Sequence, residues 1–516
     1  MKNKLFLLCF IIIVICTYSY SQNVNIVWEK CYGGSMMEAS HGSCEVFDKG
    51  IVIAADSESN DFDVHINRGS IDFYIVKIKS NGDTLWTRTF GGSNLDLGGN
   101  VAETDDSCIV FTGVTYSSDL DIINNYGNGD IFAIKLDANG NTLWKKTYGG
   151  SEIDNAYSII PTFNGGCALF GYTGSSDFYI NQIYGLNDCV LINLDQNGDT
   201  LWVKTYGGTL TEIGHNIINT SDNGFAVIGA SGSSNYDVGN NYGSYDMWLV
   251  KLDSLGNIEW EKNYGGSDGD EGLSIYQTNN GGYIMAGSTY SNDYDVHGNH
   301  GDSDYLIIRT NSTGDTLWTN TIGGSGSDRP RAIIQTSDNN FVVGGYTNSV
   351  DGDISNWYNS YDFWIVKLDD TGQILWDVCM GGNYSDHCTN IFETSDNYLF
   401  ASGSTHSTSE EIGYQHGNGD VWGVKFDFIV NTDKEIKHNS SNILIYPNPT
   451  TGKIRVQAEG VERIEVLTLQ GQKVKSQISK VKSQNTKIDL SQQAKGIYII
   501  KVTSKKGVAV EKIVLE

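Results

Sequence analysis

The chain has 516 residues and a formal net charge of −28, with 34 basic and 62 acidic side chains, 60 glycines and 4 prolines. Residues 441–516 carry 13 basic and 6 acidic side chains, so residues 22–440 hold 19 basic and 56 acidic ones, a net charge of −37. A body this acidic repels nucleic acid and anionic membranes and attracts cations or basic partners. We therefore expect no nucleic-acid partner.

Residues 1–21 have the layout of a secretory signal peptide. Lys2 and Lys4 precede the apolar run 5–16, and Ser19-Tyr20-Ser21 follows it. The run is too short to span a bilayer comfortably, so we expect cleavage near Ser21. The alternative is a lipoprotein acylated at Cys16, which follows the bulky Ile15. No later stretch approaches about 18 uninterrupted apolar residues, so the mature chain is predicted to have no transmembrane segment.

Seven cysteines remain after removal of the signal: Cys31, Cys44, Cys108, Cys167, Cys189, Cys379 and Cys388. An odd number at unmatched positions forms no disulfide framework, although Cys31–Cys44 or Cys379–Cys388 could pair in an oxidising compartment.

A repeat of 58 residues fills the chain from the signal to residue 427. It is marked by Trp28, Trp86, Trp144, Trp202, Trp260, Trp318 and Trp376, and a Gly-Gly pair follows each tryptophan. Each copy has four stretches of alternating apolar residues separated by Asp-, Asn- and Gly-rich turns, which predicts four strands. In the second copy these are 100–104, 107–115, 130–137 and 142–148.

Seven copies of four short strands predict an all-β fold, a seven-bladed β-propeller over residues 22–430. The chain opens on a fourth-strand sequence, 24–32, and the last copy stops after a third-strand sequence, 420–427. The N-terminal strand is therefore expected to complete the last blade and hide the edge that an open stack would expose. A linear solenoid, the alternative, would need distinct capping repeats. We expect the propeller to be monomeric.

Three recurring motifs carry a family resemblance. They are Gly265-Gly266-Ser267-Asp268-Gly269-Asp270, Gly113-Val114-Thr115-Tyr116-Ser117 and Asp362-Phe363-Trp364-Ile365-Val366-Lys367-Leu368. With them, residues 24–427 resemble the bacterial seven-bladed β-propeller repeat family. The resemblance implies the fold and says little about activity, because propellers host many functions.

A different module follows the polar linker 431–441. Residues 442–516 contain Pro447-Asn448-Pro449, a strand with Gly496, Tyr498 and Lys501, and a basic C-terminal strand. They resemble the type A sorting domain of the Bacteroidetes type IX secretion system. This resemblance implies a small Ig-like β-sandwich read by the secretion machinery, and a product that is secreted or held on the outer cell surface. The alternative is a small adhesive β-sandwich.

Two acidic positions are the same in every copy. The first lies ten residues after each tryptophan: Glu38, Asp96, Asp154, Glu212, Asp270, Asp328 and Asp386. The second opens each third strand: Asp72, Asp130, Asp188, Asp246, Asp304, Asp362 and Asp420. In the structural interpretation these carboxylates accept backbone N–H groups or pair with the third-strand base. The third copy has Asn193 in place of that base and Tyr179 in place of a loop acid, which suggests a loop-to-strand ion pair.

The loops before the third strands carry pairs of acids: Asp61 and Asp63, Asp119 and Asp121, Asp293 and Asp295, and Asp351 and Asp353. Calcium binds clusters of carboxylate and carbonyl oxygens, so Ca²⁺ is the one cofactor that this pattern suggests. No copy has the spacing of an EF-hand loop.

Positions that vary between copies are the candidates for ligand contact, since the invariant ones build the frame. Thirteen residues after the tryptophans stand His41, Gly99, Tyr157, His215, Leu273, Arg331 and Thr389, with Arg329 and His387 nearby. We predict a site at the channel mouth made by His41, Tyr157, His215, Arg329, Arg331 and His387. The alternative is that these positions drift freely.

Motifs of known enzymes are missing: there is no Gly-x-Ser-x-Gly elbow, His-Glu-x-x-His pair or phosphate loop. The first hypothesis is a non-enzymatic binding protein that recognises a protein, a glycan or a cation through an acidic face of long loops. The second is a hydrolase or lyase of extracellular polysaccharide, which would need two carboxylates about 5–10 Å apart at the channel mouth. No catalytic residue is assigned.

Overall fold

The computed structural model describes residues 24–358, 360–408, 412, 415–428, 444–446, 450–457, 461–468, 473–478, 485–504 and 507–515. The predicted signal peptide and linker lie outside these residues. The chain divides into two compact units, Met1–Ile429 and Val430–Glu516, and each is described by itself.

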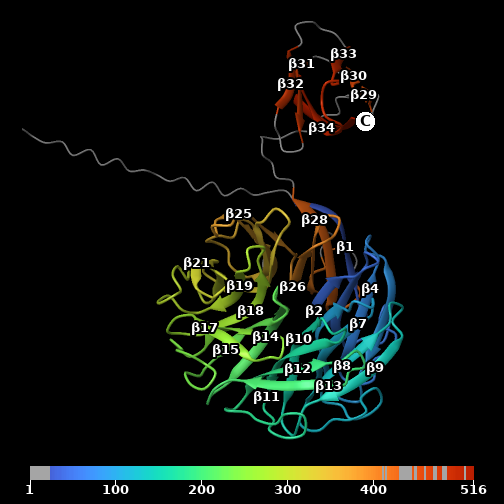
Figure 1. Cartoon of the computed structure of the whole chain (residues 1–516). Helices are drawn as coiled ribbons and strands as arrows, with labels where there is room; N and C mark the ends of the chain where they lie inside the picture. Colours follow the sequence, from blue (N-terminus) through green and yellow to red (C-terminus); the bar gives the residue numbers. More distant parts are fainter. Residues whose placement is uncertain are drawn as a thin grey trace, which may run out of the picture. The chain divides into compact units, whose positions relative to one another are not determined.

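The first unit is a seven-bladed β-propeller of four-stranded antiparallel sheets arranged around a common axis (Figure 1). The first strands of the blades are β2 (Glu38–Glu45), β6 (Asp96–Glu103), β10 (Asp154–Pro161), β14 (Glu212–Asn219), β18 (Asp270–Gln277), β22 (Asp328–Gln335) and β26 (Asp386–Glu393). The second strands are β3 (Ile51–Ser57), β7 (Ile109–Thr115), β11 (Cys167–Thr173), β15 (Phe225–Ser231), β19 (Tyr283–Thr289), β23 (Phe341–Thr347) and β27 (Leu399–Thr405).

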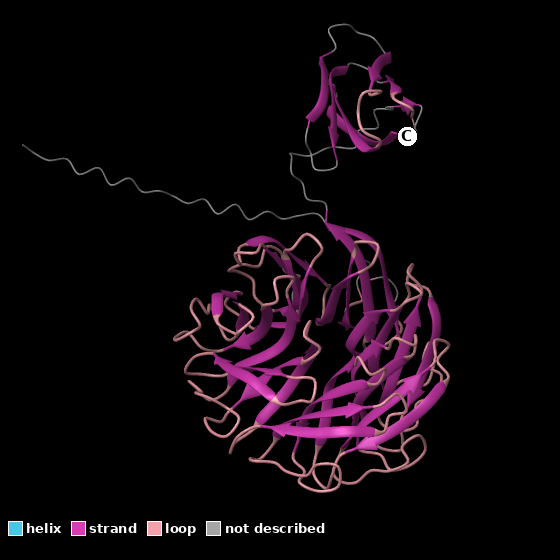
Figure 2. Ribbon diagram, in the orientation of Figure 1, coloured by secondary structure: helices cyan, strands magenta, loops and turns pink. Residues whose placement is uncertain are grey.

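The third strands are β4 (Asp72–Ile78), β8 (Asp130–Leu136), β12 (Asp188–Leu194), β16 (Asp246–Leu252), β20 (Asp304–Thr310), β24 (Asp362–Leu368) and β28 (Asp420–Phe428). The fourth strands are β5 (Thr84–Phe90), β9 (Thr142–Tyr148), β13 (Thr200–Tyr206), β17 (Ile258–Tyr264), β21 (Thr316–Ile322), β25 (Ile374–Met380) and β1 (Val24–Tyr32). First strands of adjacent blades contact one another, so they line the axis. Figure 2 shows only strands and loops in the described part of the chain.

The ring closes as the sequence predicts, because β1 pairs antiparallel with β28 from Val24↔Phe428 to Tyr32↔Val421. One boundary differs from the prediction. In the second copy the first strand begins at Asp96 rather than residue 100, because the chain already pairs with β7 before a bulge between Gly98 and Val101. The invariant acids ten residues after the tryptophans are therefore the first residues of the first strands.

The blades are held together by apolar cores between neighbouring sheets. In the second blade the second and third strands are wholly buried, while the fourth strand begins with two exposed residues. One core joins Val52 and Phe73 of the first blade to Phe111 and Phe132 of the second. Phe73 stacks on Phe132 with ring centroids 5.0 Å apart. A single blade could not bury these rings, so the stability of each blade depends on its neighbours.

Among the described residues the third-strand bases do not pair with the long-loop acids, so that expectation was wrong. Lys135 Nζ lies 2.8 Å from Asp106 Oδ2, in the tight turn between the first two strands. In the third copy Asn193 replaces the base, and the residue 58 after Asp106 is Asn164. Charge is therefore missing from both of these positions in that copy, whereas Tyr179 packs against Tyr126 and Tyr148.

All seven cysteines of the described residues are free thiols, so neither suggested disulfide is formed. Burial raises the pKa of Cys388 to about 12, which keeps this thiol protonated. Among the described residues there is no helix long and apolar enough to cross a bilayer.

The second unit is a small β-sandwich. One sheet has the order β29 (Leu444–Tyr446), β30 (Lys453–Gln457) and β33 (Asn485–Asp489). The other has the order β32 (Lys473–Ile478), β31 (Val461–Thr468), β34 (Gly496–Ser504) and β35 (Gly507–Leu515). Ile454, Ile464 and Ile500 join the two sheets in one buried core.

Candidate functional site

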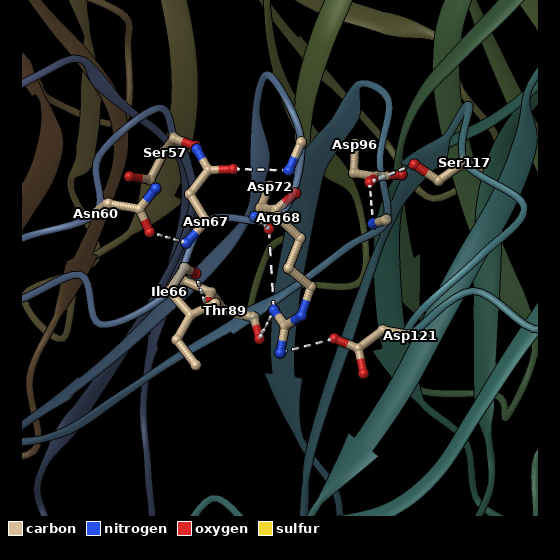
Figure 3. A network of polar contacts seen from close by, with 12 residues as sticks. Ser57, Asn60, Ile66, Asn67, Arg68, Asp72, Thr89, Asp96, Ser117 and Asp121 are labelled. Atoms are coloured by element: carbon tan, nitrogen blue, oxygen red, sulfur yellow. Dashed lines mark hydrogen bonds and ion pairs between the residues drawn. The ribbon is translucent and has the colours of Figure 1, made fainter.

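Each interblade junction buries two carboxylates around a glycine. In Figure 3, Asp72 accepts the backbone N–H of Arg68 (2.7 Å), and Asp96 accepts the hydroxyl of Ser117 (2.9 Å). A Cβ on Gly91 would lie 2.4 Å from Asp72 Oδ1 and 2.8 Å from Asp96 Oδ2. Both invariant acids are at most 1% exposed in every blade. They hold the turns in place, as the structural interpretation predicts.

Burial, with repulsion from the neighbouring acid, raises the pKa of Asp130, Asp246 and Asp362. The pKa of Asp130 rises to about 7, first through burial and then through the nearby Asp154. The pKa values of Asp246 and Asp362 also rise to about 7 for the same reasons. Each of these three pairs therefore tends to hold a proton near neutral pH, which lowers the cost of burying two carboxylates together.

The acids predicted to hold calcium have structural partners. Asp61, Asp119, Asp293 and Asp351 each accept a backbone N–H through Oδ1, from Ser35, Ser93, Ser267 and Ser325 respectively. Asp121 pairs with Lys145 (2.6 Å) and Arg68 (3.2 Å). The backbone N–H groups of Asp63, Asp295 and Asp353 donate to the glycine carbonyls of neighbouring turns. Within the described ranges, no group of three His, Cys, Asp or Glu side chains is arranged to hold a metal. Calcium binding stays a prediction.

Four of the six positions chosen from the sequence are β-bulge residues, namely His41, Tyr157, His215 and Arg331, whereas Arg329 and His387 lie in regular pairs. Register shifts occur between Ser40 and Gly42, and between Pro330 and Ala332, so that His41 and Arg331 are the extra residues of their strands. The same shift leaves Tyr157 and His215 unpaired in their strands. A bulge redirects a side chain away from the regular pleat. In these four blades the innermost strand thus presents one side chain that the sheet does not require.

These bulges lie around one cavity of about 520 Å³, the channel-mouth cavity. It lies where first strands begin and second strands end, which is the end of the propeller that carries the long loops. His41, Tyr157, His215, Arg331 and His387 all line it. Arg329 does not; its guanidinium lies 2.8 Å from Glu271 Oε2. The structure therefore brings five of the six predicted residues together.

Arg331 and His387 form one polar side of the channel-mouth cavity. The guanidinium of Arg331 lies 5.7 Å from the ring centroid of Tyr346, and Tyr346 lies 4.4 Å from His387. Among the described residues Arg331 has no ion-pair partner and Nε2 of the half-buried His387 has no hydrogen-bond partner. Burial, followed by repulsion from His406 and Arg331, lowers the pKa of His387 to about 4. This side presents a cation and a neutral imidazole.

Aromatic and imidazole rings form the other side. Tyr157 stacks on His215 at 5.4 Å and an interplanar angle of 29°. His215 Nε2 lies 2.8 Å from Glu271 Oε1. Burial alone would raise the pKa of Glu271, but contact with His215 and the charges of His215, Arg329 and Arg331 hold it at about 2. His41 is paired with Asp56 at 2.7 Å. Both carboxylates thus lie behind the cavity wall, each in contact with a histidine.

Tyr346 and His406 also line the cavity and were missed by the sequence interpretation. Tyr346 is the sixth residue of its second strand, and the equivalent positions of other blades hold Asp56, Val114 and Ser404. Variation at that position was a signal available in the sequence.

The sorting residues lie partly within the described structure. Gly496, Tyr498 and Lys501 belong to β34, and the buried Tyr498 donates its hydroxyl to the carbonyl of Ala494 (2.6 Å). Pro447, Asn448 and Pro449 lie outside the described residues.

Residues 444–516 match the family described as secretion system C-terminal sorting domain. The match indicates export, with the product secreted or held at the cell surface, and interaction of this unit with the secretion machinery. No curated protein matches the chain.

Solved structures with a similar fold include Sqt1 from Chaetomium thermophilum, at 9% identity over 79% of this chain and 100% of that one, with a TM-score of 0.38. The WD40 domain of Neurospora crassa Pan2 is 10% identical over 78% of this chain and 96% of that one, with a TM-score of 0.41. Identities this low say nothing about a ligand.

Proposed function

We propose that this is an exported binding protein whose propeller holds its ligand in the channel-mouth cavity. The observation that supports this most is the convergence of five variable side chains on one cavity. Bulges at symmetrical positions place different side chains there, so the cavity is asymmetric although the frame is not. A pocket with few convergent polar groups and aromatic walls is typical of a ligand site.

The chemistry of the cavity favours an anionic group on a saccharide. No carboxylate of the described structure lies within ion-pair distance of Arg331, whose guanidinium contacts the hydroxyl of Tyr346, and a guanidinium binds carboxylate or sulfate through two parallel hydrogen bonds. Tyr157 is 38% exposed and offers a flat aromatic face on the other side of the same cavity. Most of the propeller surface is acidic, so a cationic cavity gives an anionic ligand one favourable place to bind.

The hydrolase alternative receives no support from this geometry. Among the described residues that line the cavity there is no Asp or Glu, whereas a two-carboxylate mechanism needs a pair there. Asp56 and Glu271, which lie behind the lining, are each held by a histidine.

A glycan array probed with the full chain tests the proposal. We expect the retained glycans to carry carboxylate or sulfate groups. The Arg331→Gln variant should bind these glycans at least tenfold more weakly. Lys204→Gln, on the outermost strand of its blade, is the matched control and should leave binding unchanged. An array with no retained glycan, or retention equal in wild type and Arg331→Gln, would show the proposal to be wrong.

A further inference from the structure

A ring of exposed apolar side chains stands on the long-loop face, apart from the channel-mouth cavity. It consists of one residue from each of five successive blades, which we call the apolar crown: Phe62, Leu120, Phe178, Tyr236 and Tyr294. These side chains are 58–69% exposed. They recur at the 58-residue period, each directly beside an acidic residue of a long-loop turn.

The fold does not require apolar side chains at these positions. All five residues have φ between 51° and 59°, a left-handed conformation that bulky residues avoid and glycine adopts freely. The sixth copy has Gly352 there, with φ of 70°. The same loops are anchored by a different apolar residue two positions later, such as Val64, Ile122 or Ile180, which is buried. Exposed apolar side chains kept in an unfavourable backbone conformation point to a role outside folding.

The crown is held rigidly. In the second copy the backbone N–H of Ile122 donates to the carbonyl of Asp119 (3.0 Å), and Ser93 N–H donates to the Asp119 carboxylate (2.8 Å). The rings of four crown residues also pack against an aromatic residue of the preceding blade. The pairs are Phe62 with His416 (5.2 Å), Phe178 with Tyr126 (5.4 Å), Tyr236 with Tyr184 (5.0 Å) and Tyr294 with Tyr242 (5.1 Å). Little conformational entropy is lost when a ligand meets such a platform.

Carboxylates flank each crown residue. Phe62 lies between Asp61 and Asp63, and Tyr294 lies between Asp293 and Asp295. Tyr236 has Asp237 on one side and Asn235 on the other. An aromatic face beside carboxylates attracts an ammonium group through the ring quadrupole and through charge. The crown therefore favours a cationic ligand, opposite in sign to the ligand of the channel-mouth cavity.

We propose that the apolar crown binds a polysaccharide whose repeating units carry amino groups. A polymer matches a site that repeats once per blade, because several weak contacts on one chain add to a high avidity. The apolar face of one sugar ring can pack on one crown residue, and the hydroxyl and amino groups of the sugar can donate hydrogen bonds to the carboxylates beside it. A protein partner would need a contiguous buried patch of about 800 Å² on each side, whereas no ring contact joins one crown residue to the next in the described structure.

The test compares binding of chitosan to the full chain and to a crown variant at pH 5.5 in 0.15 M NaCl. The variant combines Phe62→Gly, Leu120→Gly, Phe178→Gly, Tyr236→Gly and Tyr294→Gly. It keeps every charge, so non-specific attraction between an acidic protein and a cationic polymer is the same in both. We expect binding to fall at least tenfold while the melting temperature stays within a few degrees, since glycine suits the backbone at these sites.

The matched control replaces the leucines at the second position of five fourth strands, Leu85, Leu143, Leu201, Leu317 and Leu375, by alanine. They are 41–57% exposed at the opposite end of the propeller, so their loss should leave chitosan binding unchanged. Equal binding of chitosan by the crown variant and wild type would overturn the proposal. So would a crown variant that loses affinity for poly-lysine but not for chitosan, because the partner would then be a basic polypeptide. Arg331→Gln should not affect chitosan binding, which separates this site from the channel-mouth cavity.

Discussion

Trp144 of the second blade lies against Gly198 in a turn of the third. The indole Nε1 donates to the carbonyl of Gln196 (3.1 Å), and a Cβ on Gly198 would lie 3.0 Å from Cδ2 of the indole. Gly198 has φ of 76°. The same relation joins Trp86 to Gly140 and Trp318 to Gly372. The tryptophan period of the sequence is therefore an interblade contact repeated around the ring.

Gly198→Ala should destabilise the propeller by about 2 kcal/mol, because it adds a left-handed alanine and a contact with Trp144. The midpoint of urea denaturation measures the loss. Gly165→Ala is the control: Gly165 has φ of 80° but nothing within 4 Å of its Cβ position. It should cost only about 1 kcal/mol. Equal losses in the two variants would show that the tryptophan contact contributes nothing.

Deletion of residues 24–32 should open the ring. β28 would then expose a full edge of unpaired backbone groups, and such an edge pairs with other chains. We expect oligomers or aggregates by size-exclusion chromatography. Trp28→Ala keeps the strand and should remain monomeric. A monomeric deletion variant with an unchanged melting temperature would contradict the closure.

Acidification should stabilise the propeller down to about pH 5. Asp130, Asp246 and Asp362 have pKa values of about 7 in the folded chain, above the ordinary value of about 3.9. The folded state binds their protons more tightly, so this stabilisation is full below pH ~4 and is lost as pH rises through ~7. Asp106, Asp222 and Asp338 act in the opposite sense. Contacts with a lysine and a threonine outweigh the effect of burial and hold their pKa at about 2, so their contribution disappears as pH falls below ~4.

The melting temperature should therefore be higher at pH 5 than at pH 8 by several degrees. Asp130→Asn keeps an acceptor for the N–H of Tyr126 and removes the charge facing Asp154. This variant should melt higher than wild type at pH 8 and show a weaker pH dependence. If it melts lower at pH 8, both carboxylates are charged and stabilising there.

Calcium at millimolar concentration should not change the melting temperature. Four of the eight predicted ligand carboxylates already accept backbone N–H groups. The measurement is a thermal melt of the full chain with Ca²⁺ and with EDTA. A rise of several degrees with Ca²⁺ that EDTA reverses would restore the calcium hypothesis.

Much of the propeller could be predicted from the sequence because its frame repeats. The tryptophans, the Gly-Gly pairs and the position of 24–32 defined seven blades and their closure. The acid that pairs with each third-strand lysine could not be predicted. Asp106 and the long-loop acids both recur at a constant sequence separation from Lys135, so the repeat pattern does not distinguish between them. Only the register places Asp106 beside Lys135. The apolar crown was overlooked because nothing in the sequence shows that Phe178 takes a positive φ and lies exposed while Ile180 is buried.

The channel-mouth site followed from variation among copies, and the structure supplied its physical basis. Four of the five predicted residues that line the cavity are bulges, so they can change without disturbing strand pairing, whereas His387 lies in a regular pair with Ser404. Arg329 was grouped with them because it is near in sequence, but it lies in a regular pair with Tyr346 and its side chain reaches Glu271.

The most direct test of the binding account is isothermal titration of the full chain with an oligogalacturonate, a saccharide that carries one carboxylate per unit. We predict saturable binding that falls at least tenfold in Arg331→Gln and is unchanged in Lys204→Gln. Absence of binding, or equal affinity in wild type and Arg331→Gln, would contradict the account.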